Sequence, residues 1–477
     1  MGPQRPTMIR SRQGPHAFNT EPHRGQPEQV VCEMKHWKTR PGVMGLVAAT
    51  TLSALVAGCA GGGNSGATSK SLVYWSMWNK PEPQAQVLQK AADAFEKSTG
   101  IHVDIKWIGR KVLTNVSANL NGGNLPDLTE QEGGELTATF GAADAAMGLN
   151  DVCAAKVTGE NVNVCDVVPR TLVDRYKTKD GQPMMMPYEL VSSALWYNAA
   201  QLPDVASKSP VTWSEWMGVL DREKKAGRPP LALDGSEGQY DNYWWTWSAM
   251  RHAGPGAVKA AVSDKTGAGW DNPALLAAAQ DVAQLVKGGY FTPNYGGSKW
   301  PAVQTGWANG ENKSDFLLMG SWAPSETSPF GAVNPKKFVY RSMPYPQVVN
   351  GKGNDATEMY LIGFAIPKKA KNPENAKKFI EFFLNKDQLS GISSKALNLT
   401  PRSDIEVPAQ LADLKKQVQA AGTNLFQADD GVNAAFPQFT TESLYPTAQK
   451  LILGNLDAVG FIKTMKAATI EYWKNHG

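Results

Sequence analysis

The clearest pattern of hydrophobic and polar positions begins at residue 72. Residues 72–78, Leu-Val-Tyr-Trp-Ser-Met-Trp, are mostly apolar and β-prone and predict a first strand. Apolar residues then recur at helical spacing up to a Thr99-Gly100 stop, and these are Val87, Leu88, Ala91, Ala92 and Phe95. Residues 101–107 alternate and predict a second strand. A strand, a helix and a strand in this order predict an α/β fold with a largely parallel sheet.

Two later segments carry equally clear helical patterns. An apolar stripe follows the helix start Asn372-Pro373-Glu374 and comprises Ala376, Phe379, Ile380, Phe383 and Leu384. The last helical pattern runs through Phe461, Met465, Ala468 and Tyr472. The chain shows no internal repeat, so we expect a globular protein and not a repeat array.

The segment before residue 72 has the parts of an export signal. Residues 43–58 carry no charge, are rich in Ala, Leu and Val, and follow three basic residues, Lys35, Lys38 and Arg40. The apolar run of about sixteen residues is shorter than the ~20 residues of a membrane-spanning helix. The residues before Cys59 resemble the lipobox of bacterial lipoproteins, which implies that Cys59 becomes an acylated N-terminus. An ordinary signal with a chance cysteine is the alternative.

Residues 59–70 are rich in Gly and Ser and are expected to form a flexible tether. Residues 1–33 are rich in Pro, Gly, Gln, Arg and His and have no apolar period. Because signals begin close to the initiator, we interpret residues 1–58 as a leader in which translation starts at Met34. On this interpretation residues 34–58 are the lipoprotein signal, and residues 1–33 are not part of the protein.

The charge balance excludes some partners. Residues 1–58 carry seven Lys or Arg and three Asp or Glu, so the remaining 419 residues hold 41 of each kind. A neutral mature chain without basic runs gives no reason to expect nucleic acid as a partner. Its length leaves room for two lobes with substantial cores.

Cys153 and Cys165 lie twelve positions apart in what we interpret as an exported protein. Such a pair predicts a disulfide, worth about 3 kcal/mol in the chain-entropy model. A metal site is the rival interpretation, but no His lies between the two cysteines, and two ligands do not make a site. We therefore expect no metal and no cofactor.

Six segments, in order along the chain, resemble the extracellular solute-binding proteins of carbohydrate ABC transporters, the group that includes the maltodextrin-binding proteins. They are residues 94–100, residues 125–128, residues 186–188 leading to 195–198, residues 211–216, residues 317–322, and residues 363–367 leading to 372–374. The resemblance covers nearly the whole mature chain. Each segment alone is weak, whereas six in the same order with similar gaps are specific.

The resemblance implies a two-lobed periplasmic-binding-protein fold of type II, with each lobe a mixed, mainly parallel sheet flanked by helices. We expect one lobe to comprise residues 71–187 and 360–402, and the other residues 188–359 and 403–477. The chain should cross between them near residues 187–193 and 358–364. Ligand would lie in the cleft between the lobes, and closure of the cleft would be the step that the transporter detects.

Aromatic side chains are the first candidates for a sugar site, because rings stack on the C–H faces of sugars. Residues 240–247 hold five aromatic rings; three are expected in the core, while Tyr240 and Trp244 are expected to line the cleft together with Gln239 before them. Trp322 lies where the resemblance implies an aromatic platform, with core packing as the alternative. Trp78 follows the first strand in a loop that borders the cleft in this fold.

Acidic and hinge residues complete the candidate set. Glu132 ends a predicted strand and is expected to bind hydroxyls, whereas Glu130 is expected to be a solvated surface acid. At the first crossing, Tyr188 and Glu189 stand where the resembling family has ligand contacts. The maltodextrin-binding branch places its acid later, where this chain has Val191 and Ser192, so maltodextrin itself is in doubt.

Two further residues have weaker support as ligand contacts. Tyr360 lies at the second crossing between the lobes. Arg402 is either a ligand contact or a structural ion-pair partner.

The sequence is compatible with several other functions. An enzyme has little support: the chain has no Walker loop, HExxH or Gly-x-Ser-x-Gly, and three of its six His lie in residues 1–36. A non-transport carbohydrate-binding lipoprotein would use the same site. The same fold can bind a polyamine, a metal or a phosphate-bearing compound, but many aromatic residues with few acids favour a neutral sugar. We expect a monomer that is lipid-anchored outside the cytoplasmic membrane and delivers a mono- or oligosaccharide to an ABC permease.

Overall fold

The computed structural model describes residues 70–141, 143–331 and 338–476. The described residues belong to one compact unit. The predicted signal, the lipid attachment at Cys59 and the tether up to residue 69 lie outside the described residues. Within the described ranges, no helix combines the length and apolar character needed to cross a bilayer.

The first sheet has five strands in the order β2-β1-β3-β10-β4. Their bounds are β1 Ser71–Ser76, β2 His102–Trp107, β3 Leu128–Glu132, β4 Met186–Val191 and β10 Tyr360–Ala365. Strands β2 and β3 pair with β1 in parallel, and β10 runs antiparallel to both β3 and β4. The two predicted strands and the parallel pairing between them are thus confirmed.

The second sheet has four strands in the order β6-β7-β5-β8. Their bounds are β5 Ser193–Asn198, β6 Leu231–Ala232, β7 Phe316–Gly320 and β8 Tyr340–Met343. Strands β6 and β7 pair in parallel, and β5 runs antiparallel to both of its neighbours, β7 and β8. In each sheet a single strand runs against the others, β10 in the first and β5 in the second, so the expected mixed, mainly parallel sheets are confirmed.

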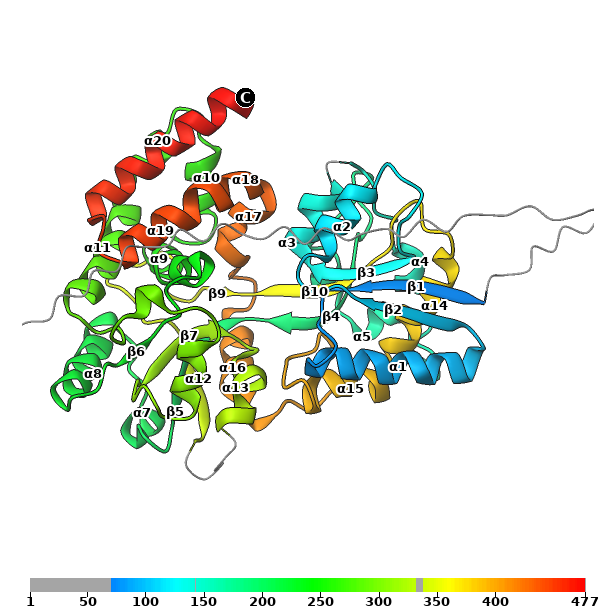
Figure 1. The fold of residues 1–477 in the computed structure, drawn as a ribbon, viewed down its shortest axis with the longest axis horizontal. Coiled ribbons are helices and arrows are strands. Elements are labelled where there is room, and N and C mark those ends of the chain that lie inside the picture. Colours follow the sequence, from blue (N-terminus) through cyan, green and yellow to red (C-terminus); the bar gives the residue numbers. More distant parts are fainter. Residues whose placement is uncertain (1–69, 142, 332–337, 477) are drawn as a thin grey trace, which may run out of the picture. The chain divides into compact units, whose positions relative to one another are not determined.

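The chain crosses between the two sheets at two junctions. Strand β4 is separated from β5 by Ser192 alone, and β9, Thr357–Glu358, is separated from β10 by Met359. Figure 1 shows β4 and β10 side by side, running from the first sheet toward the elements of the second. Strand β9 pairs with β11, Leu425–Phe426. Both junctions fall inside the ranges expected for the crossings.

Helices fill the segments between the strands. Those near the first sheet in sequence are α1 Pro83–Thr99, α2 Val112–Asn119, α3 Gly133–Leu136, α4 Asn150–Ala154, α5 Val164–Val167, α6 Arg170–Val173, α14 Pro373–Phe383 and α15 Lys386–Ser394. The others are α7 Pro203–Ser207, α8 Trp213–Lys225, α9 Gly238–Ala253, α10 Ala257–Ser263, α11 Pro273–Lys287, α12 Ala302–Ala308, α13 Ala323–Gly331, α16 Ala412–Ala421, α17 Val432–Ala435, α18 Pro437–Phe439, α19 Tyr445–Ile452 and α20 Ala458–His476.

The predicted helical patterns correspond to buried faces. Helix α1 buries its predicted apolar residues and ends at Gly100, whose φ of 70° closes the helix in a left-handed cap. Helix α14 buries Phe379 and Phe383 against the first sheet's core. Helix α9 differs from both, because every residue from Asp241 to Arg251 is buried. A helix buried on all sides has no apolar stripe to read from its sequence.

Cys153 in α4 and Cys165 in α5 form a disulfide with Cα atoms 4.9 Å apart. The bond joins two short helices that neither propensity nor length would stabilise alone. Among the described residues, no group of His, Cys, Asp and Glu is placed to hold a metal ion.

Candidate ligand-binding site

A cavity of about 910 Å³ is lined by residues from both sheet regions. One side is formed by the segment after β1, the end of β3, and strands β4 and β10. The other side is formed by the first turn of α9, the segment before α12, and α13. A cavity of this size can enclose most of a small organic ligand.

Seven of the ten predicted ligand contacts line this cavity: Trp78, Glu132, Glu189, Gln239, Tyr240, Trp322 and Tyr360. They come from segments up to 282 positions apart, between residues 78 and 360 of the chain. The fold therefore brings together residues that only a resemblance could connect in the sequence.

Aromatic rings form much of the apolar lining. The Trp322 ring lies 6.5 Å from that of Tyr360, centroid to centroid. Trp300 stands at the cavity with 43% of its surface exposed. At Gly320, the last residue of β7, a Cβ atom would lie 2.2 Å from the Trp322 ring. Only glycine at that position therefore allows Trp322 its observed place.

Tyr188 lies behind the lining and does not reach the cavity, so its expected ligand contact is not supported. The Tyr188 hydroxyl accepts a hydrogen bond of 2.8 Å from the Trp78 indole Nε1. The tyrosine ring packs 4.7 Å from Phe364 and 5.5 Å from Phe383. Because successive residues of a strand face opposite sides, Glu189 lines the cavity, whereas Tyr188 lies on the other side of the strand and fixes the Trp78 indole by its hydrogen bond.

Carboxyl groups dominate the polar lining. Seven acids contribute to it, namely Glu82, Glu132, Glu135, Glu189, Glu237, Glu326 and Asp429, against a single basic residue, Arg110. The Arg110 guanidinium forms two hydrogen bonds to Glu82, of 2.6 and 3.0 Å, and lies 4.7 Å from the centre of the Trp78 ring. The lining therefore carries an excess of acids that no basic side chain offsets.

Glu189 is the least compensated of these acids. It is 1% exposed, and its Oε2 atom has no hydrogen-bond partner. Burial raises the pKa of Glu189 to about 8, and the neighbouring Gln84 and Arg110 oppose that rise. An unpaired carboxylate in such a place is costly, so the side chain gains from any donor that a ligand supplies.

Two more lining acids are held in place by hydrogen bonds from the protein. Glu132 caps helix α3 by accepting a 3.0 Å hydrogen bond from the Glu135 backbone N–H. Asp429 accepts hydrogen bonds of 2.7 Å from Asn242 and 2.5 Å from the Tyr445 hydroxyl. Burial raises the pKa of Glu132 to about 7 and that of Asp429 to about 6.

Trp244 does not line the cleft and belongs to the core. It is fully buried in α9, where its ring stacks on that of Trp216 at 6.3 Å and meets Phe291 edge-on at 5.3 Å. The residues around Trp244 on α9 are buried on every side of the helix. The cluster of aromatic residues in the sequence therefore belongs mainly to the core and not to the cavity lining. Tyr240 lines the cavity because it lies in the helix's first turn.

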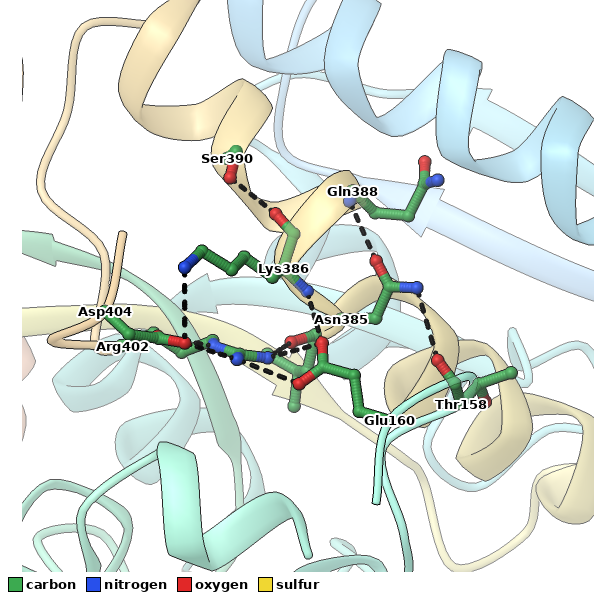
Figure 2. A network of polar contacts seen from close by, with 9 residues as sticks. Thr158, Glu160, Asn385, Lys386, Gln388, Ser390, Arg402 and Asp404 are labelled. Carbon is green, nitrogen blue, oxygen red and sulfur yellow. Dashed lines mark hydrogen bonds and ion pairs between the residues drawn. The ribbon is translucent and has the colours of Figure 1, made fainter. Parts of the chain in front are cut away.

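Arg402 is the third residue that the structure places elsewhere (Figure 2). Its guanidinium donates to Glu160 at 2.9 Å, to Asp404 at 2.8 Å and to the Leu384 carbonyl at 2.9 Å. Glu160 also accepts from the Lys386 backbone N–H at 2.6 Å. Arg402 therefore joins the loop between the disulfide cysteines to the start of α15. This is the role of a structural ion-pair partner, which was the alternative to a ligand contact.

Glu130 is not a surface acid. It is fully buried and accepts hydrogen bonds of 2.7 Å from Ser76 Oγ and 3.1 Å from the Met77 backbone N–H. Burial raises its pKa to about 7. The carboxyl group thus fixes the turn that leads from β1 to Trp78.

Several lining residues were not predicted. Glu326 accepts from the Gln304 amide at 2.9 Å and from the Trp300 indole at 3.3 Å. Trp322 immediately precedes α13, and the Glu326 backbone N–H donates to the Trp322 carbonyl at 2.9 Å, so the two residues are one helical turn apart. Trp300 and Arg110 lie in segments without a regular pattern, and no sequence signal would have found them.

The arrangement places aromatic rings beside many hydrogen-bond acceptors. Such a lining suits reversible binding of a polar molecule with apolar faces. Together with two sheets joined by crossing strands, it defines a two-lobed ligand-binding protein.

Comparisons with known proteins identify the family. Residues 79–389 match the family of bacterial extracellular solute-binding proteins, and the chain belongs to that family. The chain is 25% identical over 387 residues to the diacetylchitobiose binding protein NgcE of Streptomyces coelicolor, which covers 77% of each chain. A probable sugar-binding periplasmic protein of Rhizobium meliloti is 26% identical over 219 residues, 46% of this chain and 50% of the relative.

Solved structures confirm the fold. A chitin oligosaccharide binding protein matches with a TM-score of 0.68 and 21% identity, over 86% of this chain and all of its own. The solute-binding protein RafE, solved in complex with raffinose, matches with a TM-score of 0.66 and 16% identity, over 84% of this chain and 99% of its own. The expected periplasmic-binding-protein fold is therefore correct.

Proposed function

We propose that this protein captures a mono- or oligosaccharide outside the cytoplasmic membrane and delivers it to the permease of an ABC importer. The observation that carries the proposal is the cavity, in which Trp78, Tyr240, Trp322 and Tyr360 offer rings beside closely spaced acceptors. Sugars present C–H faces to rings and hydroxyl donors to carboxylates. The names of the relatives support the same class, because they are sugar-binding proteins.

Closure between two lobes would be the event that the permease recognises. We propose lobes of residues 71–187 with 360–402 and of residues 188–359 with 403–477, hinged at the β4–β5 and β9–β10 junctions. The hinge carries its own polar contacts: Ser193 Oγ donates to Glu358, and Gln417 donates to the Ser193 carbonyl at 3.1 Å. Bending there would bring Trp322 and Tyr240 toward Trp78 across the cavity.

Export and anchoring belong to the same proposal. The family is extracellular, and a lipid on Cys59 with a short flexible tether would confine the protein to the membrane surface near its permease. Binding needs no covalent step, so we propose that the protein acts as a monomeric binder without enzymatic activity or cofactor. Replacing Cys59 by Ser should release it from the membrane fraction; a variant that stays there would overturn the anchor.

A ligand screen tests the proposed function. Purified residues 70–477 are heated with a panel of mono- and oligosaccharides, and with spermidine and inorganic phosphate as non-sugar probes. At least one sugar should raise the Tm in a concentration-dependent way, because a ligand that binds only the folded state stabilises it. A response to spermidine or phosphate alone would overturn the sugar assignment.

A further inference from the structure

We propose that the cavity selects an amino sugar whose C2 amine is free and protonated, over the acetylated or hydroxyl-bearing sugar of the same shape. The inference rests on the proposed function and names the ligand class of the same site. It follows from the acidic side chains of the lining and from one buried carboxyl oxygen, Glu189 Oε2, that has no hydrogen-bond partner.

The excess of acids is the first step. The lining holds seven carboxyl groups and one guanidinium, and that guanidinium is engaged by Glu82. The expectation from sequence that few acids accompany the aromatic rings is therefore wrong at this site. A concave surface lined by one sign of charge concentrates ligands of the opposite sign. Burial raises the pKa values of Glu132, Glu189 and Asp429, and a bound cation would lower them again and so favour their charged form. The cavity accordingly favours a cation and disfavours uronic acids and phosphate-bearing compounds.

The incomplete hydrogen bonding of Glu189 is a second observation, and it does not depend on the number of acids in the lining. Its Oε2 atom has no donor and is shielded from solvent, while other atoms of the side chain line the cavity. Five of the other six acids already accept hydrogen bonds from the protein: Glu82, Glu132, Glu135, Glu326 and Asp429. Glu189 is thus the buried carboxyl group that a bound ammonium would compensate.

The rings decide between a cationic sugar and a linear polyamine. Trp322 and Tyr360 lie 6.5 Å apart at one place in the cavity, and Trp300 stands at another with 43% of its surface exposed. Flat faces of this size match pyranose rings, whereas an extended amine chain presents no face to them. A sugar with an ammonium group satisfies both the rings and the acids.

The acetylated sugar fits the acids less well. An ammonium has three donors and a positive charge, whereas an acetamide has one donor and adds a carbonyl acceptor. Beside a lining rich in acceptors, that carbonyl has few partners and opposes the carboxylates. A hydroxyl group is intermediate, because it donates one hydrogen bond and carries no charge.

Three disaccharides that differ only at C2 test the proposal. The β-1,4-linked disaccharides of glucosamine, N-acetylglucosamine and glucose are titrated by calorimetry into the purified full chain at pH 7, with spermidine as a fourth ligand. The glucosamine disaccharide should bind at least about tenfold more tightly than the other two disaccharides. Raising the salt concentration should weaken the binding of the glucosamine disaccharide and leave that of the other two unchanged.

Variants assign the preference to the lining. Glu189→Gln should reduce the ratio of the affinities for the glucosamine and glucose disaccharides at least about tenfold, because the amide keeps the shape of the side chain and one acceptor oxygen but carries no charge. Glu237→Gln, at a half-buried lining position, provides a second test if the first variant does not fold. Glu471→Gln is the matched control, since this exposed glutamate of α20 lies outside the cavity.

The outcomes separate this inference from the proposed function. Equal or tighter binding of the acetylated or glucose disaccharide would overturn the amino-sugar inference and leave the sugar-binding function intact. An amine preference that Glu189→Gln and Glu237→Gln both retain would overturn the role of the lining acids. Binding of spermidine without any disaccharide would overturn both proposals.

Discussion

Glu358 at the hinge should make the stability of the protein depend on pH. Its carboxyl group is 1% exposed, and Ser193 Oγ donates a hydrogen bond to it. Burial raises the pKa of Glu358 from 4.5 to about 8; the nearby carboxylates Asp429 and Glu132 raise it further, and the Ser193 hydrogen bond lowers it. The substitution to examine is Glu358→Gln, which keeps the shape and the acceptor and removes the titration.

The sign follows from proton linkage. A raised pKa means that the folded protein binds more protons than the unfolded chain between pH 4.5 and pH 8. The free energy of unfolding is therefore highest below that range and falls as the pH rises through it. For this one group, the loss between pH 5 and pH 8 is at most about 3 kcal/mol.

Urea unfolding of wild type and Glu358→Gln at pH 5, 6.5 and 8 measures this pH dependence. At pH 5 the variant and the wild type should unfold at similar urea concentrations, because the wild-type carboxyl group is neutral there. At pH 8 the variant should be more stable, by up to about 3 kcal/mol. Glu471→Gln, an exposed position, controls for the loss of one charge. Parallel pH profiles for wild type and Glu358→Gln would show that the Glu358 carboxyl group has the same pKa in the folded and unfolded protein.

Three further changes have definite expected outcomes. Gly320→Ala should displace Trp322 and weaken sugar binding about tenfold or more in calorimetry with little change in Tm, because the new Cβ would lie 2.2 Å from the ring; unchanged affinity would contradict this. Arg251→Met should lower the free energy of unfolding in urea by about 3 kcal/mol or more, since the buried guanidinium donates to three backbone carbonyls; a loss below ~1 kcal/mol would contradict it. Cys153→Ser with Cys165→Ser should cost about 2–5 kcal/mol in the same assay, and an unchanged midpoint would show that the disulfide contributes little.

The fold could be predicted where a segment buries one face. The strand at 72–78 is a short apolar, β-prone run, and the helix ending at Gly100 has a regular apolar period; both were placed within a few residues of β1 and α1. The second sheet could not be predicted as well, since β5, β6 and β7 are buried on both faces and show no alternation. The direction of its pairing depends on how the chain crosses from β4 to β5, which is a tertiary property.

The site could be predicted in part for a similar reason. Residues at strand and helix ends, such as Glu132 and Trp322, lie where this fold brings ends together. The predictions of Trp244 and Arg402 as ligand contacts were wrong, because the sequence does not reveal whether a ring or a cation is enclosed by neighbouring side chains. Trp300 was missed because its loop has no period at all.

The central claim is that the cavity binds a carbohydrate through its aromatic lining. Its most direct test is a tryptophan-fluorescence titration of purified residues 70–477 with the sugar that gives the largest Tm shift. The comparison is between wild type, Trp322→Ala, and Trp473→Ala as a matched control whose indole donates to the Val262 carbonyl outside the cavity. Binding should be saturable and should weaken by about 2 kcal/mol, roughly 30-fold, in Trp322→Ala and not in Trp473→Ala. Equal affinity in all three proteins would contradict the central claim.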